Sequence, residues 1–227
     1  MAKQIRLAKR VVTESDRLAV ELVDRFRKAR VFVANLMSSP GSGKTSLLEE
    51  TARRLGKELR MAVIEGDLAT DRDAQRIQRA GIPSYQINTG GGCHLSAQQI
   101  LDALEQFDLA ALDVLFIENV GNLVCPAEFD LGERRRVVLA STPEGDDKPL
   151  KYPLAFHKAQ CVVLNKIDLV SATDFSLEAF RAYVRGINPT VPILELSCRT
   201  GEGIEAWLDW VRAERRAALS GPPPSPR

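Results

Sequence analysis

The sequence has few of the features that mark exported, membrane or nucleic-acid-binding proteins. It holds only four cysteines, too few for a disulfide scaffold, and no apolar run reaches the ~18 residues that a membrane helix needs. The charged N-terminus lacks the apolar core of a signal peptide. Lys and Arg number 31 against 30 Asp and Glu, so the net charge of +1 is too small to hold nucleic acid by bulk charge. These absences favour a cytoplasmic protein without nucleic-acid or membrane partners.

Hydrophobic residues make up 44% and charged residues 27% of the 227 residues, values typical of a globular domain. Short apolar runs alternate with helical patterns, and apolar strands of this kind are buried on both faces of a parallel sheet. We predict strands at 31–37, 61–64, 84–87, 114–117, 137–140, 161–164 and 193–196, and helices at 44–58, 71–80, 95–107, 175–185 and 204–218. The pattern predicts one doubly wound α/β domain over residues 31–219, with a mostly parallel sheet and helices on both faces.

The two ends of the chain have a different composition. Residues 1–30 comprise a basic segment, 1–12, and an N-terminal helix that begins near Thr13 or Ser15, either of which can cap it. One apolar stripe at helical spacing predicts that this helix packs on the main domain. Residues 220–227 are rich in proline and predict a disordered tail.

A phosphate-binding loop lies between the first predicted strand and the following helix. The usual pattern is G-x-x-x-x-G-K-[ST], and the chain has Ser38-Ser39-Pro40-Gly41-Ser42-Gly43-Lys44-Thr45, with Ser38 in place of the first glycine. Glycines let the backbone N–H groups surround phosphate oxygens, and we expect Lys44 to reach the β- and γ-phosphates. The flanking strand and helix argue against a chance Gly-Ser loop. The residues expected to bind the nucleotide here are Ser39, Pro40, Gly41, Ser42, Gly43, Lys44, Thr45 and Ser46.

Acidic residues follow two of the predicted strands, at the edge where a parallel sheet places its ligands. Asp67 comes after the second strand, and Glu118 occupies the place of the Walker B acid, which is usually Asp. Together with Thr45 they form the expected Mg²⁺ site, since Mg²⁺ takes hard oxygen ligands. Asp73 can orient the attacking water, or can instead be a helix N-terminal charge. The expected catalytic residues are therefore Lys44, Asp67, Asp73 and Glu118.

The segment from Asn165 to Asp168 predicts guanine as the base. It reads N-K-x-D and follows the strand at 161–164. A carboxylate at Asp168 can accept from both N1–H and the 2-amino group of guanine, a donor pair that adenine lacks, so the wrong base leaves polar groups unpaired. We expect Asn165, Lys166 and Asp168 to hold the base, with Ser197 and Cys198 on a second base-contacting loop. The pattern predicts a GTPase that uses GTP, GDP and Mg²⁺.

Cysteine and histidine residues follow two other strands. Cys93 and His94 come after three glycines, and Cys125 lies seven residues beyond Glu118. Thiolate and imidazole are suitable ligands for Zn²⁺, Ni²⁺ or Cu, but three ligands are too few for a closed site. Spacing alone leaves ordinary loop cysteines as an open alternative.

Several segments together resemble the HypB family, SIMIBI-class P-loop GTPases related to UreG. They are Asn35-Leu-Met-Ser-Ser-Pro-Gly-Ser-Gly-Lys-Thr45, Glu65-Gly-Asp67, Gly90-Gly-Gly-Cys-His-Leu95, Glu118-Asn-Val-Gly-Asn-Leu-Val-Cys-Pro126, Glu144-Gly-Asp-Asp-Lys-Pro-Leu-Lys-Tyr-Pro153 and Asn165-Lys-Ile-Asp168. The resemblance covers residues 16–211, and the family also shows serine at the position of Ser38.

The resemblance implies a GTP-hydrolysing metallochaperone that helps insert nickel into the large subunit of [NiFe]-hydrogenase, working with a HypA-type chaperone. It implies a homodimer when GTP is bound, and a nickel site at the dimer interface on Cys93, His94 and Cys125, which Zn²⁺ can also occupy. Some members carry an additional N-terminal Cys or His nickel site. Cys93 is the first cysteine and His94 the first histidine of this sequence, so we expect no separate N-terminal nickel store.

Three alternatives remain at this point. A urease-type nickel GTPase resembling UreG has a contiguous Cys-Pro-His motif, whereas here the cysteines are split between two segments. A P-loop kinase for a small molecule normally uses ATP, which the N-K-x-D segment opposes. In a third alternative the chain is a metal buffer whose GTPase activity is incidental.

Overall fold

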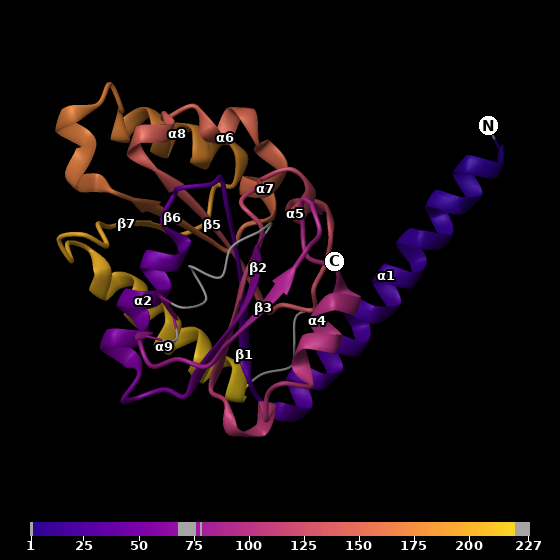
Figure 1. Cartoon of the computed structure of the whole chain (residues 1–227). Helices are drawn as coiled ribbons and strands as arrows, with labels where there is room; N and C mark the ends of the chain where they lie inside the picture. The colour runs from indigo at the N-terminus through magenta and orange to yellow at the C-terminus, as the bar shows by residue number, and fades with distance from the viewer. Residues whose placement is uncertain (1, 68–75, 78, 221–227) are drawn as a thin grey trace.

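Seven parallel strands form the central sheet (Figure 1). The structure, a computed structural model, describes residues 2–67, 76–77 and 79–220, and the side chains in these ranges except those of residues 2–13 and Asp67. The spatial order of the strands is β3-β2-β4-β1-β5-β6-β7. Their bounds are β1 (Phe32–Ser38), β2 (Met61–Asp67), β3 (Ser84–Asn88), β4 (Val114–Glu118), β5 (Arg135–Ser141), β6 (Cys161–Asn165) and β7 (Ile193–Glu195).

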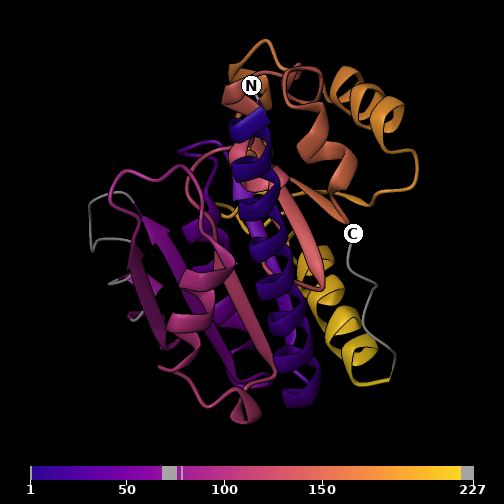
Figure 2. The same ribbon diagram turned by 90° about the vertical axis from the view of Figure 1, so that its right-hand side faces the viewer.

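Helices cover both faces of the sheet (Figures 1 and 2). The side chains of β1 show which helices pack on which face. Phe32 and Leu36 pack into the core under α2 (Lys44–Leu55) and α9 (Ile204–Ser220). Val33 faces the opposite side, in the core under α1 (Ala2–Ala29) and α4 (Ala97–Leu104). Met37 lies on that side too, in a separate apolar cluster under α7 (Pro153–Lys158) and α8 (Leu177–Ile187). One face therefore carries a single core, and the other carries two.

Short helices lie at the carboxyl edge of the sheet. They are α5 (Cys125–Glu128), α6 (Lys148–Lys151) and the 3-10 turns η2 (Thr142–Glu144) and η3 (Ile167–Ala172); a further turn, η1 (Leu109–Ala111), precedes β4. Proline stands in the first turn of α5, α6, α7 and η2. Proline fits there because the first N–H groups of a helix have no partner within it. Elements of three to six residues are too short to show periodicity, so the sequence pattern did not predict them.

The predicted fold class is confirmed, and every pairing between the seven strands is parallel. The predicted start of the N-terminal helix near Thr13 or Ser15 is wrong, because α1 begins at Ala2. Residues 2–12 contain neither glycine nor proline, so no helix breaker separates them from the rest. The predicted helix at 71–80 lies largely outside the described residues, and so does the predicted tail from residue 221. Among the residues that the structure describes, no helix is long and apolar enough to cross a membrane.

Gly132 permits the close packing of α1 against the loop before β5. Its φ is +72°, and a Cβ there would lie 2.5 Å from the Leu22 Cβ and 2.9 Å from the Val23 nitrogen of α1. We expect Gly132→Ala to lower the free energy of unfolding by about 2 kcal/mol, through backbone strain and the displaced helix. Chemical denaturation measures this change.

The matched control is Gly186→Ala on α8, where a Cβ meets no atom within 4 Å. We expect that substitution to be neutral or to stabilise the fold by about 0.5 kcal/mol, because alanine favours helix. Equal stability of the two variants would contradict the packing described for α1.

Candidate functional site

Two adjoining cavities open at the carboxyl edge of the sheet. One, of about 400 Å³, is lined by residues of the β1–α2 loop and by the ends of β2 and β4. The other, of about 360 Å³, is lined by residues around Asn165 and Ser197. Gly43, Ser46 and Lys166 line both cavities. A ligand with an anionic part and a flat aromatic part can therefore extend from one cavity into the other.

The loop between β1 and α2 has the conformation that a phosphate cradle needs. Gly41 and Gly43 have φ values of +78° and +99°, which only glycine adopts without strain. A Cβ on Gly43 would also lie 2.4 Å from the Asn165 amide nitrogen. Lys44 begins α2 and its Nζ donates to the Ser38 Oγ at 2.9 Å. The unusual Ser38 thus holds the lysine at the floor of the loop.

Carboxylates are placed beside the cradle by the pairing of β2 with β4. Glu65 and Glu118 are register partners at the ends of these strands, and their exposed fractions are 2% and 7%. Thr45 donates from its Oγ1 to the Glu118 Oε1 at 2.9 Å. All three line the larger cavity. A hydroxyl and two buried carboxylates beside a phosphate cradle form the oxygen donor set that fits Mg²⁺.

A second layer holds the cradle from the side of β5. Glu144 accepts from the Ser42 Oγ and from the Ser141 Oγ, each at 2.7 Å. These hydroxyls lower the pKa of Glu144, although burial opposes the shift. Lys148 pairs with Glu144 at 3.3 Å and donates to the Ser39 Oγ at 3.0 Å. The 144–148 segment therefore contacts the phosphate loop directly.

Asn165 joins three loops at the second cavity. Its amide donates to the Ser42 carbonyl at 3.0 Å and its Oδ1 accepts from the backbone N–H groups of Lys166 and Cys198, at 2.8 and 3.2 Å. The Lys166 Nζ donates to the Gly41 carbonyl at 2.7 Å. The side chain of Asn165 thereby fixes the base cavity to the phosphate loop.

Asp168 lies on the wall of this cavity. Its Oδ1 accepts from the Ser197 Oγ at 2.5 Å, and the same hydroxyl accepts from the backbone N–H groups of Arg199 and Thr200. Burial raises the pKa of the Cys198 thiol to about 12, so this cysteine is a neutral lining group. The two loops that the sequence analysis assigned to the base do meet at one cavity.

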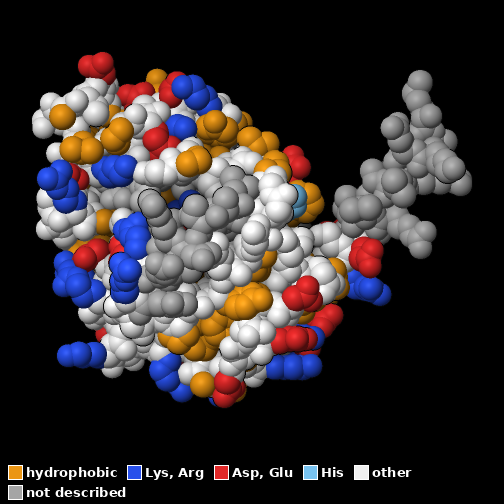
Figure 3. Space-filling view, viewed as in Figure 1, with side chains coloured by type: hydrophobic (Ala, Val, Ile, Leu, Met, Phe, Trp, Pro, Cys, Tyr) orange, Lys and Arg blue, Asp and Glu red, His pale blue; other side chains and the backbone are white. Residues whose placement is uncertain are grey.

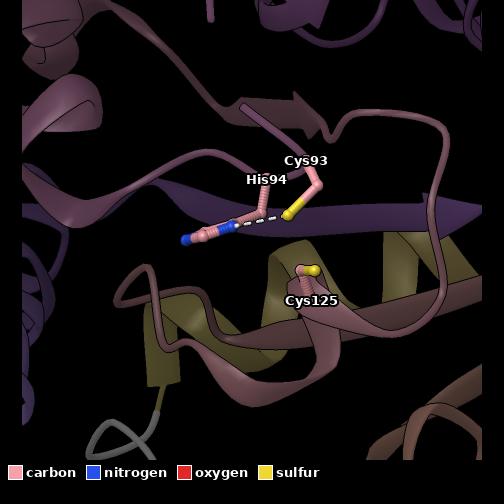
Figure 4. Close-up of side chains that lie close together, drawn as sticks. All are labelled: Cys93, His94 and Cys125. Atoms are coloured by element: carbon pink, nitrogen blue, oxygen red, sulfur yellow. Dashed lines mark hydrogen bonds between the residues drawn. The ribbon is translucent and has the colours of Figure 1, made fainter. Parts of the chain in front are cut away.

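The side chains of Cys93, His94 and Cys125 lie close together, as Figure 4 shows. Their candidate ligand atoms all lie within 4.8 Å of one another, and the Cys93 Sγ lies 3.5 Å from the His94 Nδ1. Cys93 is exposed, whereas the other two are half-buried. The His94 ring stacks on Phe129, with centroids 4.0 Å apart and planes 5° from parallel. The cluster is an open face of three soft ligands.

The surroundings of the cluster shift the protonation of two of its members in opposite senses for metal binding. A hydrogen bond to the neighbouring Cys125 thiol, together with desolvation, raises the pKa of Cys93, so protons compete with a metal ion for this sulfur. Burial lowers the pKa of His94 and so favours the neutral imidazole, the form that coordinates metal.

The segment between Glu118 and Cys125 contacts both sites. Asn122 forms a backbone bridge with Ser38 of the phosphate loop, and its side chain donates to the Cys93 carbonyl at 3.3 Å. A Cβ on Gly121 would lie 2.9 Å from Pro40. Residues 118–125 therefore connect the phosphate loop to the cysteine cluster and contact both.

The Asp67 side chain and the whole of Asp73 lie outside the described residues, although β2 does end at Asp67. The sequence analysis missed Glu65, Glu144 and Lys148 as site residues. Glu65 stands in the same Glu-Gly-Asp segment as Asp67, and Glu144 and Lys148 stand in a segment quoted above for its resemblance without an assigned role.

Comparisons with known proteins agree with this geometry. Residues 32–195 match the family described as CobW/HypB/UreG, nucleotide-binding domain. The chain is 50% identical over 218 residues to hydrogenase maturation factor HypB of Azotobacter vinelandii, covering 96% of this chain and 72% of that one. It is 49% identical over 207 residues to hydrogenase maturation factor HypB of Escherichia coli K12, covering 91% and 71% of the two chains.

Solved structures give the same relationship. Hydrogenase maturation factor HypB from Archaeoglobus fulgidus superposes with a TM-score of 0.85 at 40% identity, covering 89% of this chain and 99% of that one. HypB from Helicobacter pylori, solved in complex with nickel, superposes with a TM-score of 0.85 at 39% identity, covering 92% and 98%. The chain therefore belongs to the CobW/HypB/UreG family and, within it, to the HypB hydrogenase maturation factors.

Proposed function

We propose that this protein is a GTP-hydrolysing nickel metallochaperone whose Cys/His cluster is coupled to the bound nucleotide. The observation that carries the proposal is the 118–125 segment, which contacts the Thr45 hydroxyl at one end and includes Cys125 at the other. Between them, Asn122 touches both Ser38 and Cys93. A change at the γ-phosphate therefore has a short covalent and hydrogen-bonded route to the metal ligands.

In the proposed reaction, water attacks the γ-phosphorus of GTP and loses a proton, the bond from that phosphorus to the β,γ-bridging oxygen breaks, and the products are GDP and inorganic phosphate. Gly41 and Gly43 turn backbone N–H groups toward the phosphates, and Lys44 neutralises charge on the β,γ-bridge. Thr45, Asp67 and Glu118 are the proposed Mg²⁺ ligands, and that ion would supply charge neutralisation at the phosphates. Asp73 remains the proposed residue for orienting the water.

We propose guanine as the base because of the hydrogen-bond acceptors at the second cavity. Asp168 is held by the Ser197 hydroxyl, and its carboxylate is an acceptor pair for guanine N1–H and the 2-amino group. The N-K-x-D segment opposes an ATP-dependent kinase, one of the alternatives above. The family assignment likewise argues against the kinase, and the split cysteines argue against a UreG-like protein.

A GTP-bound homodimer is part of the proposal. Val124, Leu150 and Leu154 are exposed by 53%, 55% and 41% on short helices or loops that pack together beside the cysteine cluster. Hydrophobic side chains reach the surface among charged ones in the upper part of Figure 3, over α6, α7 and α8. Three ligands leave a soft metal ion incompletely held, and a second copy can complete the coordination. Lys148 connects this surface to the phosphate loop through Ser39.

Nickel is the proposed cargo, since a relative of 39% identity was solved in complex with nickel. Zn²⁺ suits the same ligands. The proposed partners are a HypA-type chaperone that supplies nickel and the large subunit of [NiFe]-hydrogenase that receives it, in the cytoplasm. The relative in Helicobacter pylori is described as a hydrogenase/urease maturation factor.

Guanine selection is tested by Asp168→Asn. The amide replaces one acceptor by a donor, so we expect weaker GTP binding and a gain in affinity for xanthine nucleotides, which carry an acceptor at that position. Fluorescent-nucleotide titration measures both affinities. Equal affinity of the wild-type protein for ATP and GTP would refute guanine specificity.

Hydrolysis is tested by Lys44→Ala. We expect turnover to fall by at least ~10²-fold, as for the loss of one preorganised charge at a transition state. Phosphate release under single-turnover conditions measures it. Lys57→Ala, in the loop after α2, is the matched control and should hydrolyse GTP like wild type. Near-normal turnover in Lys44→Ala would refute the role of the phosphate loop.

Coupling is tested by measuring nickel affinity with GDP and with a non-hydrolysable GTP analogue. We expect the two affinities to differ by about 5- to 150-fold, the usual range of allosteric coupling. Cys125→Ala should lose both high affinity and the nucleotide effect, whereas Cys161→Ala, on a buried strand, should keep them. Equal affinities in the two nucleotide states would make the protein a metal buffer with an incidental GTPase.

A further inference from the structure

A buried polar network lies under the metal cluster, and nothing in the proposed function uses it. Its members are side chains on β1 and β5, directly after β4 and in the loop before β5, namely Asn35, Asn119, Glu133 and Arg136. Their exposed fractions are 0%, 1%, 9% and 5%. Buried groups of this kind are costly unless they are fully hydrogen-bonded, so the arrangement of their bonds is informative.

The network sits at the seam between two apolar cores. Asn35 and Arg136 are register partners on β1 and β5, and Asn35 stands between Val33 and Met37, which belong to the separate cores on that face of the sheet. The Asn35 amide donates to the Glu133 Oε1 at 3.4 Å, and the Arg136 Nε donates to the same oxygen at 2.5 Å. The network therefore spans the seam from β4 to β5.

One arm of the network holds the loop that carries His94. The Asn119 Oδ1 accepts from the Leu95 N–H at 3.1 Å and from its neighbour Val120 at 3.0 Å, and its amide donates to the Asn35 Oδ1 at 3.3 Å. Leu95 follows His94 directly and is fully buried. Asn119 thus fixes the backbone one residue from a metal ligand.

The other arm holds the loop that carries Cys125. The Arg136 guanidinium donates to the Ala127 carbonyl at 3.2 Å and to the Phe129 carbonyl at 2.9 Å. Lys158 also donates to the Ala127 carbonyl, at 3.0 Å. Phe129 is the residue whose ring stacks on His94. Arg136 thereby fixes the end of α5, which Cys125 begins, and the platform under the imidazole.

We propose that Asn119 and Arg136 are positioning residues of the metal site. By holding the backbone beside His94 and beyond Cys125 on one rigid network, they set the distance between the ligands on the two loops. This inference rests on the metal site of the proposed function. Outer partners of this kind commonly change metal affinity by about 10- to 100-fold when they are removed.

The test is nickel titration of the full chain with GDP bound, followed by competition with a chelator and by the thiolate-to-nickel charge-transfer absorption. The main variant is Arg136→Lys, which keeps a cation beside Glu133 but cannot donate to Glu133 and to both carbonyls in the guanidinium geometry. We expect the nickel dissociation constant to rise by about 10- to 100-fold and the charge-transfer band to shift or weaken. GDP affinity and the circular dichroism spectrum should stay those of wild type.

Two further variants keep the test decisive. Phe129→Leu leaves the backbone and the network intact but removes the stack on His94, so it should change the nickel spectrum even if Arg136→Lys fails to fold. Asn119→Ala should lower nickel affinity like Arg136→Lys. The matched control is Asn188→Ala, an amide that donates to backbone carbonyls other than those that Arg136 holds, namely those of Phe156, His157 and Ala159. It should bind nickel like wild type.

The outcomes separate this inference from the proposed function. If Cys125→Ala loses nickel while Arg136→Lys and Phe129→Leu bind it with wild-type affinity and spectrum, the metal site stands and the positioning role is refuted. The role is also refuted if Asn188→Ala weakens nickel binding as much as Arg136→Lys, because the effect is then one of general stability. If Cys125→Ala binds nickel like wild type, the metal site itself fails, and the inference fails with it.

Discussion

The alternation of side chains at the end of β4 is the constraint on which both sites depend. Successive residues of a strand point to opposite faces of the sheet. Glu118 therefore faces α2 and accepts from Thr45 at the phosphate loop, while Asn119 faces the other side and accepts from the Leu95 N–H beside His94. A shift of β4 along its neighbours would disturb both contacts together. The pairing of β4 with β1 and β2 on its two sides fixes that register.

The same sheet edge explains why the open cluster of Cys93, His94 and Cys125 can be well positioned. Cys93, His94 and Cys125 all lie in loops, and loops are the least constrained part of a fold. Here the loops are held by the buried side chains of Asn119 and Arg136, each on or next to a central strand. The ligands can remain accessible to a partner while their backbone is held from beneath. The buried polar network keeps the backbone of the two loops rigid. The exposed side chain of Cys93 keeps the cluster accessible.

Much of the fold could be predicted because its strands are apolar and bounded by clear turns. The predicted strand at 114–117 differs from β4 by one residue, Glu118, whose carboxylate broke the apolar run. The predicted strand at 61–64 likewise stops before a carboxylate, that of Glu65, whereas β2 extends to Asp67. The short α5, α6 and α7 gave no periodic signal. The first residues of α1 were not predicted as helix, because the hydrophobic pattern near the N-terminus is weak.

Some residues of the candidate site could be predicted from the sequence, and others could not. Residues in motifs with a known mechanism, such as Lys44 and Asp168, were predicted, and the structure places them on the expected cavities. Arg136 was not predicted, because it is the last of three consecutive arginines and resembles an ordinary charged surface. Its burial is decided by register with Asn35, a long-range pairing that local sequence does not encode.

The central claim is that residues 118–125 couple the nucleotide to the metal cluster, and linkage tests it most directly. Thermodynamic reciprocity requires that nickel change the ratio of GTP-analogue to GDP affinity by the same factor by which the nucleotide changes nickel affinity. The decisive measurement is therefore that ratio, determined by calorimetry with and without saturating nickel. The account predicts a nickel-dependent ratio in the wild-type protein and a nickel-independent one in Cys125→Ala. A wild-type ratio that nickel leaves unchanged would contradict it.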